Sequence, residues 1–415
     1  MQGMIKRAQT ALLEKYLKKF PVVVIIGARQ VGKTTLVRQL LKDGHSYFTF
    51  DNEAVTLTAK EGPESFLTQA AKITIDEVQK LPEILSTLKR LVDEDRRPGR
   101  FILTGSANLL MLPKVRESLA GRAVYIEMEP LTIFESLPEK IKTPRIIQLL
   151  TANSAEIAWK KLNQFKPRRF PIKELIFRGG YPDPWLEKDD HLRQAWFKSY
   201  VKSYLEKDIR DISQIKNLPE FRKFLSLAAF RSGQILSKSD LARDAGISYS
   251  TAQHFFSLLQ VSFQIFTIDP FYRNIGKRLI KAPKLMWNDT GLAIHLQGLN
   301  RWEEIERLGR AGHLLENKLA IELKALLSIF LPGAGLFYWR TSGGAEVDFV
   351  VQNNNLLVPI EVKWAEKAGR YDLRGIESFL KDFSSASPWG IILYRGKTLL
   401  RPRKNIFMVP LEYLF

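Results

Sequence analysis

Short apolar runs alternate with longer segments of helical spacing over the first third of the chain. Each run has the length of a buried strand, and a stretch with helical periodicity separates it from the next. The runs lie near residues 22–26, 46–50, 72–75, 100–104 and 123–128. This alternation predicts a parallel sheet covered by helices, so we expect an α/β domain over residues 1–136.

From residue 137 the pattern becomes helical and basic. Lysines and arginines recur between Lys140 and Lys173, and prolines interrupt the segment. We interpret residues 137–225 as a helical connector or lid. Its basic residues form either a surface that contacts phosphate or a solvated connector, and the sequence favours neither.

Residues 226–300 follow the order of a winged helix. A serine-capped helix, a turn at Gly246 and a second helix starting at Ser248 succeed one another. The polar start of the second helix is what a helix that reads a DNA groove presents. Two strands then bracket the basic segment 272–278, which is a candidate wing on DNA phosphate. The alternative is that this fold contacts proteins only.

The last segment, 301–415, combines a long helix with several strands. A polar turn makes two of these strands a hairpin, which brings Asp348 close to Glu361. Glu361 and Lys363 are two positions apart and point to one face of their strand. With Glu316 on the long helix, they form the D…E-x-K arrangement of PD-(D/E)xK nucleases.

In that arrangement carboxylates hold a divalent metal, and Lys363 positions or activates a water beside the scissile phosphate. We therefore expect a restriction-endonuclease-like α/β domain with a second candidate metal site. Two alternatives are a fold kept for binding without cleavage and a plain charged strand face. The proline usual shortly before the aspartate is absent, since Gly343 and Gly344 stand there.

Composition and charge narrow the class of protein. A chain of 415 residues exceeds one typical domain, so we expect two or three. It has no apolar run long enough for a membrane span and no apolar signal segment. The absence of cysteine excludes thiol catalysis and cysteine-ligated metals, and it fits a reducing cytoplasm. A net charge of +19 makes nucleic acid, above all DNA, the expected partner.

One segment carries recognisable phosphate chemistry. It has the pattern G-x-x-x-x-G-K-[ST] between a strand and a helix, where backbone N–H groups and the helix N-terminus surround phosphates. Lys33 is expected to reach the outer phosphates, and the Thr34 hydroxyl is expected to ligate Mg²⁺. The expected nucleotide-binding residues are Gly27, Ala28, Arg29, Gln30, Val31, Gly32, Lys33, Thr34 and Thr35.

Two carboxylates follow the strand near 72–75. We expect Asp76 to hold Mg²⁺, directly or through water, and Glu77 to act as the base that polarises the attacking water. The strand near 100–104 ends in a small polar tip. Its Ser106 is a candidate contact of the γ-phosphate or of the water.

Taken together, these motifs resemble those of archaeal and bacterial AAA-type ATPases that carry a C-terminal domain of unknown function. The resemblance covers nearly the whole chain. It rests on residues 27–35, 75–79, 103–106, 118–122, 129–135, 177–182, 204–208, 289–291, 339–348 and 360–363.

The resemblance implies hydrolysis of ATP with Mg²⁺, a winged-helix-like middle and a nuclease-like end. It also implies that Arg122 contacts ATP in its own chain or reaches a neighbour's γ-phosphate as an arginine finger, with Arg116 as the other candidate. A finger requires a homo-oligomer, and AAA-type ATPases commonly work as rings such as hexamers.

Three hypotheses follow from these observations. The leading one is a Mg²⁺-dependent ATPase that binds DNA and couples hydrolysis to translocation or remodelling of branched or forked DNA. The second is an ATP-gated, metal-dependent nuclease. The third is a nucleotide-dependent switch or scaffold whose winged helix binds protein.

Overall fold

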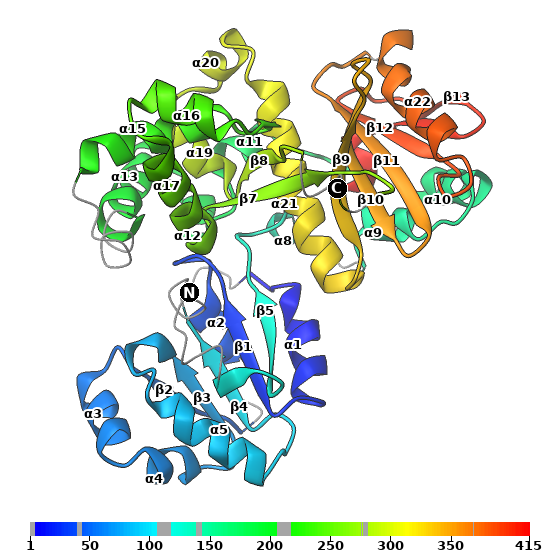
Figure 1. Cartoon of the computed structure of the whole chain (residues 1–415). Coiled ribbons are helices and arrows are strands. Elements are labelled where there is room, and N and C mark those ends of the chain that lie inside the picture. Colours follow the sequence, from blue (N-terminus) through cyan, green and yellow to red (C-terminus); the bar gives the residue numbers. More distant parts are fainter. Residues whose placement is uncertain are drawn as a thin grey trace.

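The computed structural model describes residues 5–39, 44–105, 118–137, 143–205, 217–274, 276, 281–367 and 369–415. These residues form two lobes, each built around one sheet (Figure 1). The first lobe, coloured blue to cyan, contains the N-terminal third, and a larger lobe contains the rest. None of the helices in these ranges is long and apolar enough to cross a membrane.

The sheet of the first lobe has five parallel strands, which confirms the predicted parallel α/β fold. Strands β1, β3 and β4 are buried along their whole length, because helices cover both faces of the sheet. In spatial order the strands are β2 (Ser46–Thr49), β3 (Ile73–Asp76), β4 (Phe101–Thr104), β1 (Val22–Ile26) and β5 (Ala123–Glu127).

Side chains of β1 alternate between two hydrophobic cores, as the pleat of a strand requires. Val22 and Val24 pack with one set of helices, whereas Val23 and Ile25 pack with another. The first set is α3 (Glu53–Glu61), α4 (Pro63–Thr68) and α5 (Ile84–Glu94), and the second is α1 (Gln9–Leu17) and α2 (Lys33–Gln39).

A nine-stranded sheet runs through the larger lobe and crosses residue 300, where the sequence predicted a domain boundary. Parallel pairing of Asp269 with Phe337 and of Pro270 with Tyr338 joins its two parts. In spatial order the strands are β13 (Leu400–Arg403), β14 (Ile406–Pro410), β12 (Gly390–Tyr394), β11 (Leu356–Lys363), β10 (Glu346–Asn353), β9 (Gly335–Arg340), β7 (Ile265–Pro270), β8 (Lys284–Trp287) and β6 (Gln234–Ile235).

Helices cover this sheet in three groups that belong to different parts of the chain. Those around the β7–β8 end are α13 (Asp190–Tyr200), α15 (Leu218–Phe230), α16 (Lys238–Ala245), α17 (Tyr249–Val261) and α19 (Thr290–Leu296). One face of β10–β12 packs on α9 (Arg145–Leu150), α10 (Ala155–Gln164), α11 (Ile172–Arg178) and α23 (Leu411–Leu414), and the other packs on α22 (Arg374–Asp382). Shorter elements are α8 (Ile133–Ser136), α12 (Pro182–Leu186), α20 (Trp302–Arg307), the 3₁₀ turns Val78–Lys80 and Arg370–Leu373, and the π turn Val201–Leu205.

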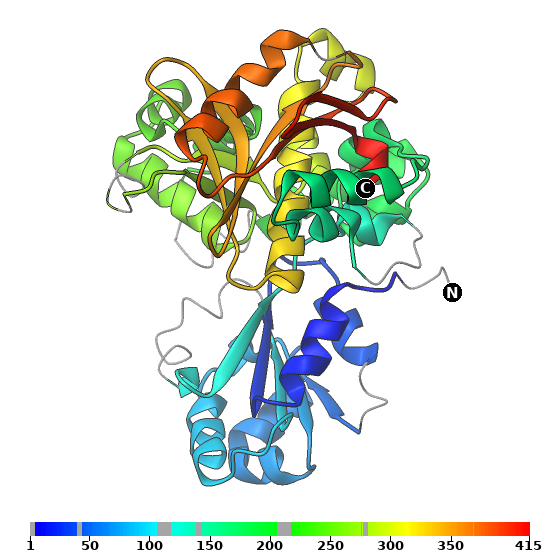
Figure 2. The same cartoon turned by 90° about the vertical axis from the view of Figure 1, so that its right-hand side faces the viewer.

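Helix α21 (Ala311–Phe330) is the centre of the larger lobe, and Figure 2 shows it in yellow, reaching down toward the first lobe. A helix that is apolar on all sides is a buried helix, and most of α21 is buried. Four of its buried polar residues lie in the interior of the fold, where each needs a partner. They are Glu316, Asn317, Lys318 and Glu322.

Side chains of α21 also fix the junction between the lobes. The Glu322 carboxylate accepts the backbone N–H groups of Ile133 (2.5 Å) and Phe134 (3.2 Å) at the start of α8. Lys324 pairs with Glu127 (2.6 Å) and with Glu129, which lie at the end of β5. Helix α21 is thus bonded both to the end of β5 and to the start of α8, the next helix along the chain.

Burial raises the pKa of the Glu322 carboxyl to about 7, despite its two backbone donors. The folded chain therefore keeps a proton that the unfolded chain releases above about pH 4.5, and the free energy of unfolding falls as pH rises toward 7. We expect Glu322→Gln to reduce this fall by a few kcal/mol, measured by chemical unfolding between pH 5 and pH 8. Glu14→Gln on the exposed side of α1 is the control and should follow the wild type; a slope unchanged in Glu322→Gln would refute the assignment.

Candidate nucleotide site and a second acidic cluster

The loop between β1 and α2 needs glycine for steric reasons. Gly27 has φ +148°, and a Cβ there would lie 2.3 Å from the carbonyl oxygen of Met128. Gly32 has φ +96°, also in the region that favours glycine. The loop is thereby pressed against the chain that leaves β5, with its backbone wrapped around the start of α2.

Lys33 begins α2, and its ammonium donates to the carbonyl oxygens of Gly27 (2.9 Å) and Ala28 (2.7 Å). Its side chain therefore crosses the loop from inside. Arg7 holds the loop from outside, because its guanidinium donates to the carbonyl oxygens of Val31 and Glu129, both at 2.6 Å. Sequence reasoning missed Arg7, which lies outside the motif.

The Asp76 carboxylate accepts hydrogen bonds from hydroxyl groups on three elements. Its Oδ2 accepts the Thr34 hydroxyl (2.8 Å) and the Tyr47 hydroxyl (2.7 Å), and its Oδ1 accepts the Thr104 hydroxyl. Burial, with the hydrogen bond to Asp76 second, raises the pKa of Tyr47 to about 12, so Tyr47 remains a donor. Thr34 and Asp76 thus meet, as a Mg²⁺ site beside the loop requires; this oxygen-rich donor set fits the ion.

Glu77 follows with φ +56° and ψ +42°, a left-handed conformation that costs a non-glycine residue about 1 kcal/mol or more. The Gln79 side chain donates to its carboxylate. This backbone turns Glu77 into a pocket that Lys33 and Thr34 also line. The strained backbone of Glu77 thus directs its carboxylate toward the loop between β1 and α2.

The larger lobe completes the same pocket. Pro182 and Asp183, the first residues of α12, line it opposite the loop. The preceding turn is held firmly, because Asp289 accepts the N–H of Gly180 (2.5 Å) and a Cβ on Gly179 would lie 2.4 Å from the Asp289 carboxylate. Residues 177–182 belong to the family resemblance, but the sequence gave no sign that this turn lies beside the nucleotide pocket.

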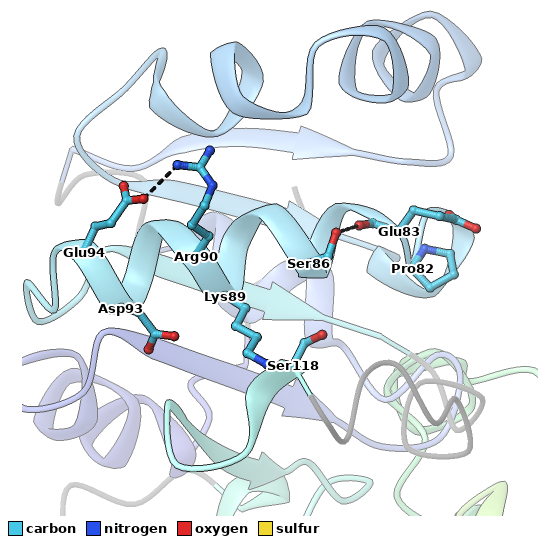
Figure 3. A pocket seen from close by; sticks show the side chains of 8 residues that line it. All are labelled: Pro82, Glu83, Ser86, Lys89, Arg90, Asp93, Glu94 and Ser118. Carbon is cyan, nitrogen blue, oxygen red and sulfur yellow. Dashed lines mark hydrogen bonds and ion pairs between the residues drawn. The ribbon is translucent and has the colours of Figure 1, made fainter.

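Arg122 lies beside α5 of the first lobe. Its guanidinium forms a two-point pair with Asp93 on α5 (2.7 and 2.6 Å). Figure 3 shows Asp93 in a groove along α5, and among the described residues none that lines this groove also lines the pocket at Lys33. Arg122 is not among the described residues that line the pocket at Lys33, and the candidates Ser106 and Arg116 lie outside the described residues.

The fold brings the C-terminal candidates together. Asp348 Oδ2 accepts the N–H of Val362 (2.8 Å), and Lys363 pairs with Glu361 (2.7 Å) on the same strand. Glu316 lies across from them on α21. Burial and then the charge of Asp348 raise the pKa of both Glu316 and Glu361 to about 8.

A lysine that the sequence did not single out lies within this cluster. The Lys284 ammonium is 2.8 Å from Glu316, 2.8 Å from Glu346 and 3.5 Å from Asp348. Burial alone would lower the pKa of Lys284, but the three carboxylates outweigh it and raise the pKa. Glu346 was foreseeable, since it is two positions before Asp348 and so on the same strand face.

Comparison with known proteins separates the chain into three matched parts. Residues 19–137 match the AAA domain. Residues 169–303 match a domain of unknown function (DUF8612), and residues 311–414 match another (DUF4143). The N-terminal lobe is thus an AAA-type P-loop ATPase domain, whereas the winged-helix and nuclease-like interpretations stay predictions.

The relatives carry no assigned function. An uncharacterized protein of Mycobacterium tuberculosis is 30% identical over 360 residues, which cover 86% of this chain and 74% of the relative. An uncharacterized protein of Methanocaldococcus jannaschii is 23% identical, covering 91% of this chain and 83% of the relative. Among solved structures, a Walker-type ATPase of Pyrococcus abyssi is similar over 71% of this chain and 96% of that chain, with 16% identity and a TM-score of 0.45.

Substitution of Gly27 tests the tight packing of the loop. We expect Gly27→Ala to weaken ATP binding by about tenfold or more, because the added methyl group displaces the loop from the Met128 carbonyl oxygen. The measurement is titration with a fluorescent ATP analogue at fixed Mg²⁺. Gly44→Ala is the matched control, since Gly44 also has positive φ but has open space around it; equal losses in both variants would contradict the steric account.

Proposed function

We propose that this chain, which belongs to the family of AAA-domain proteins that end in a domain of unknown function (DUF4143), hydrolyses ATP with Mg²⁺ and couples hydrolysis to movement or remodelling of DNA. The ATPase part is carried by one observation: Thr34 bonded to Asp76 beside Lys33 and Glu77. The DNA part is supported by the net charge of +19 and by an exposed polar helix start.

The residues of the pocket divide the work of hydrolysis. Lys33 exchanges its two carbonyl partners for the outer phosphates of ATP. Thr34 and Asp76 would hold Mg²⁺, which neutralises phosphate charge when bound. Glu77 orients and deprotonates the attacking water, and Gln79 holds its carboxylate meanwhile.

The proposed reading helix is α17. Ser248 caps it by accepting the N–H of Thr251 (3.1 Å), and Tyr249 in its first turn is 54% exposed. Gly246 ends α16 in a left-handed conformation, so the two helices join in a tight turn. Residues 275, 277 and 278 of the candidate wing lie outside the described residues.

A homo-oligomer, such as a hexameric ring, is part of the proposal. Arg122 pairs with Asp93 and is not among the described residues that line its own nucleotide pocket, so in this proposal it reaches a neighbour's γ-phosphate. It would have to leave Asp93 to do so. In the unassembled chain the Asp93 carboxylate thus occupies the guanidinium of Arg122, which a neighbour's γ-phosphate would occupy in the oligomer.

ATP hydrolysis by wild type, Lys33→Ala and Glu77→Gln is the first test. We expect both variants to lose turnover, Glu77→Gln by at least about a hundredfold with nucleotide binding kept, because only its general base is removed. Single-stranded, duplex and forked DNA are added in turn, and one form should stimulate the wild type. Turnover indifferent to every DNA form, together with a nucleotide-dependent change in particle size, would replace DNA remodelling by the protein-binding switch.

A second test addresses α17. We expect Tyr249→Ala to weaken DNA binding by about tenfold, because an exposed aromatic side chain in a reading helix supplies contact area to the groove. Fluorescence anisotropy with labelled DNA at several salt concentrations measures this loss. Tyr125→Ala, which removes an exposed tyrosine from β5, is the control and should bind like the wild type; equal affinity of Tyr249→Ala and wild type would remove α17 from the interface.

A further inference from the structure

Lys284 is placed in the interior by the pairing of its own strand. It lies in β8, where its backbone pairs with Ile268 of β7 and with Ile235 of β6. Only 2% of the residue is exposed. A lysine at such a position must direct its ammonium to a buried acceptor, because the cost of an unpaired buried charge is large.

The three hydrogens of this ammonium match three carboxylates. Glu316 accepts a hydrogen bond at 2.8 Å, Glu346 forms an ion pair at 2.8 Å, and Asp348 lies at 3.5 Å. The ring of Tyr338 covers the ammonium, with its centroid 5.4 Å away. The Lys284 ammonium is therefore enclosed by three carboxylates and by the ring of Tyr338.

A divalent metal ion does not fit at that point. It would need oxygens of the same carboxylates at about 2.0–2.6 Å. The ammonium already lies among those oxygens, and a second positive charge beside this buried ammonium would be repelled. Lys363 neutralises Glu361 in the same way from the other side, at 2.7 Å.

We propose that Lys284 is the resident cation of this acidic cluster, so that the C-terminal domain binds no catalytic metal and does not cleave nucleic acid. Asp348 of the D…E-x-K set, together with Glu316 and Glu346, instead forms a tether with Lys284. Through Lys284 the hairpin of β7 and β8 is attached to α21 and to β10. The nuclease-like arrangement is thereby used for structure, and any DNA bound by the chain is left intact.

Binding of Mn²⁺ to the full chain without nucleotide tests this proposal, with electron paramagnetic resonance as the readout. Wild type and Asp348→Asn should bind equal amounts of Mn²⁺. Lys284→Met should gain one Mn²⁺ site, and the double variant Lys284→Met with Asp348→Asn should lose it again. Lys324→Met, which removes a half-buried lysine paired with two glutamates, is the matched control and should create no site that depends on Asp348.

Two results would overturn the proposal. One is a Mn²⁺ ion, or Mn²⁺-dependent DNA cleavage, that is present in wild type and lost in Asp348→Asn. The other is a folded Lys284→Met chain, verified by its thermal unfolding, that gains no Mn²⁺. If Lys284→Met does not fold, the comparison of wild type with Asp348→Asn still decides. ATP hydrolysis is measured on another site, so neither result depends on the proposed ATPase mechanism.

Discussion

The need to neutralise the polar side chains of a buried helix determines how the larger lobe is assembled. Helix α21 carries Glu316, Asn317, Glu322 and Lys324. Their partners come from three other segments: Lys284 and the backbone of Trp287 on β8, the start of α8, and the acidic end of β5. Breaking one such buried pair leaves an uncompensated charge, so these contacts specify one arrangement of the chain.

Bonds between buried charged groups also connect the two lobes to the loop between β1 and α2. Arg7 bonds to the loop carbonyl of Val31, to the carbonyl of Glu129 and to the carboxylate of Glu135. Glu129 also bonds to Lys324 of α21 and accepts the side-chain amide of Asn288. A displacement of the loop would therefore act on charged groups that α21 shares. The loop and the larger lobe are physically linked through these few bonds.

Sequence reasoning was reliable where the physical requirement is local. The five strands and the loop around Lys33 could be read directly, because strand length, glycine and lysine spacing are all properties of neighbouring residues. The roles of Tyr47 and Asp183 could not be predicted, since Tyr47 reaches Asp76 and Asp183 reaches the pocket from elements whose place depends on the tertiary fold. Lys284 was read as part of an ordinary strand for the same reason. The pairing of β7 with β9 is also invisible in the sequence, since about seventy residues separate the two strands and no pattern specifies their register.

That pairing has a consequence for work with fragments. A piece of the chain that starts near residue 301 would carry β9 as an open edge, with unsatisfied backbone groups where β7 belongs. It would also lack Lys284, so Glu316 and Asp348 would lose the ammonium that lies between them, whereas Glu346 would keep Arg340 at 3.8 Å. We expect such a fragment to bind divalent metals, because the cut removes Lys284 from the carboxylates. Metal dependence seen in it would be a property of the cut and not of the intact protein.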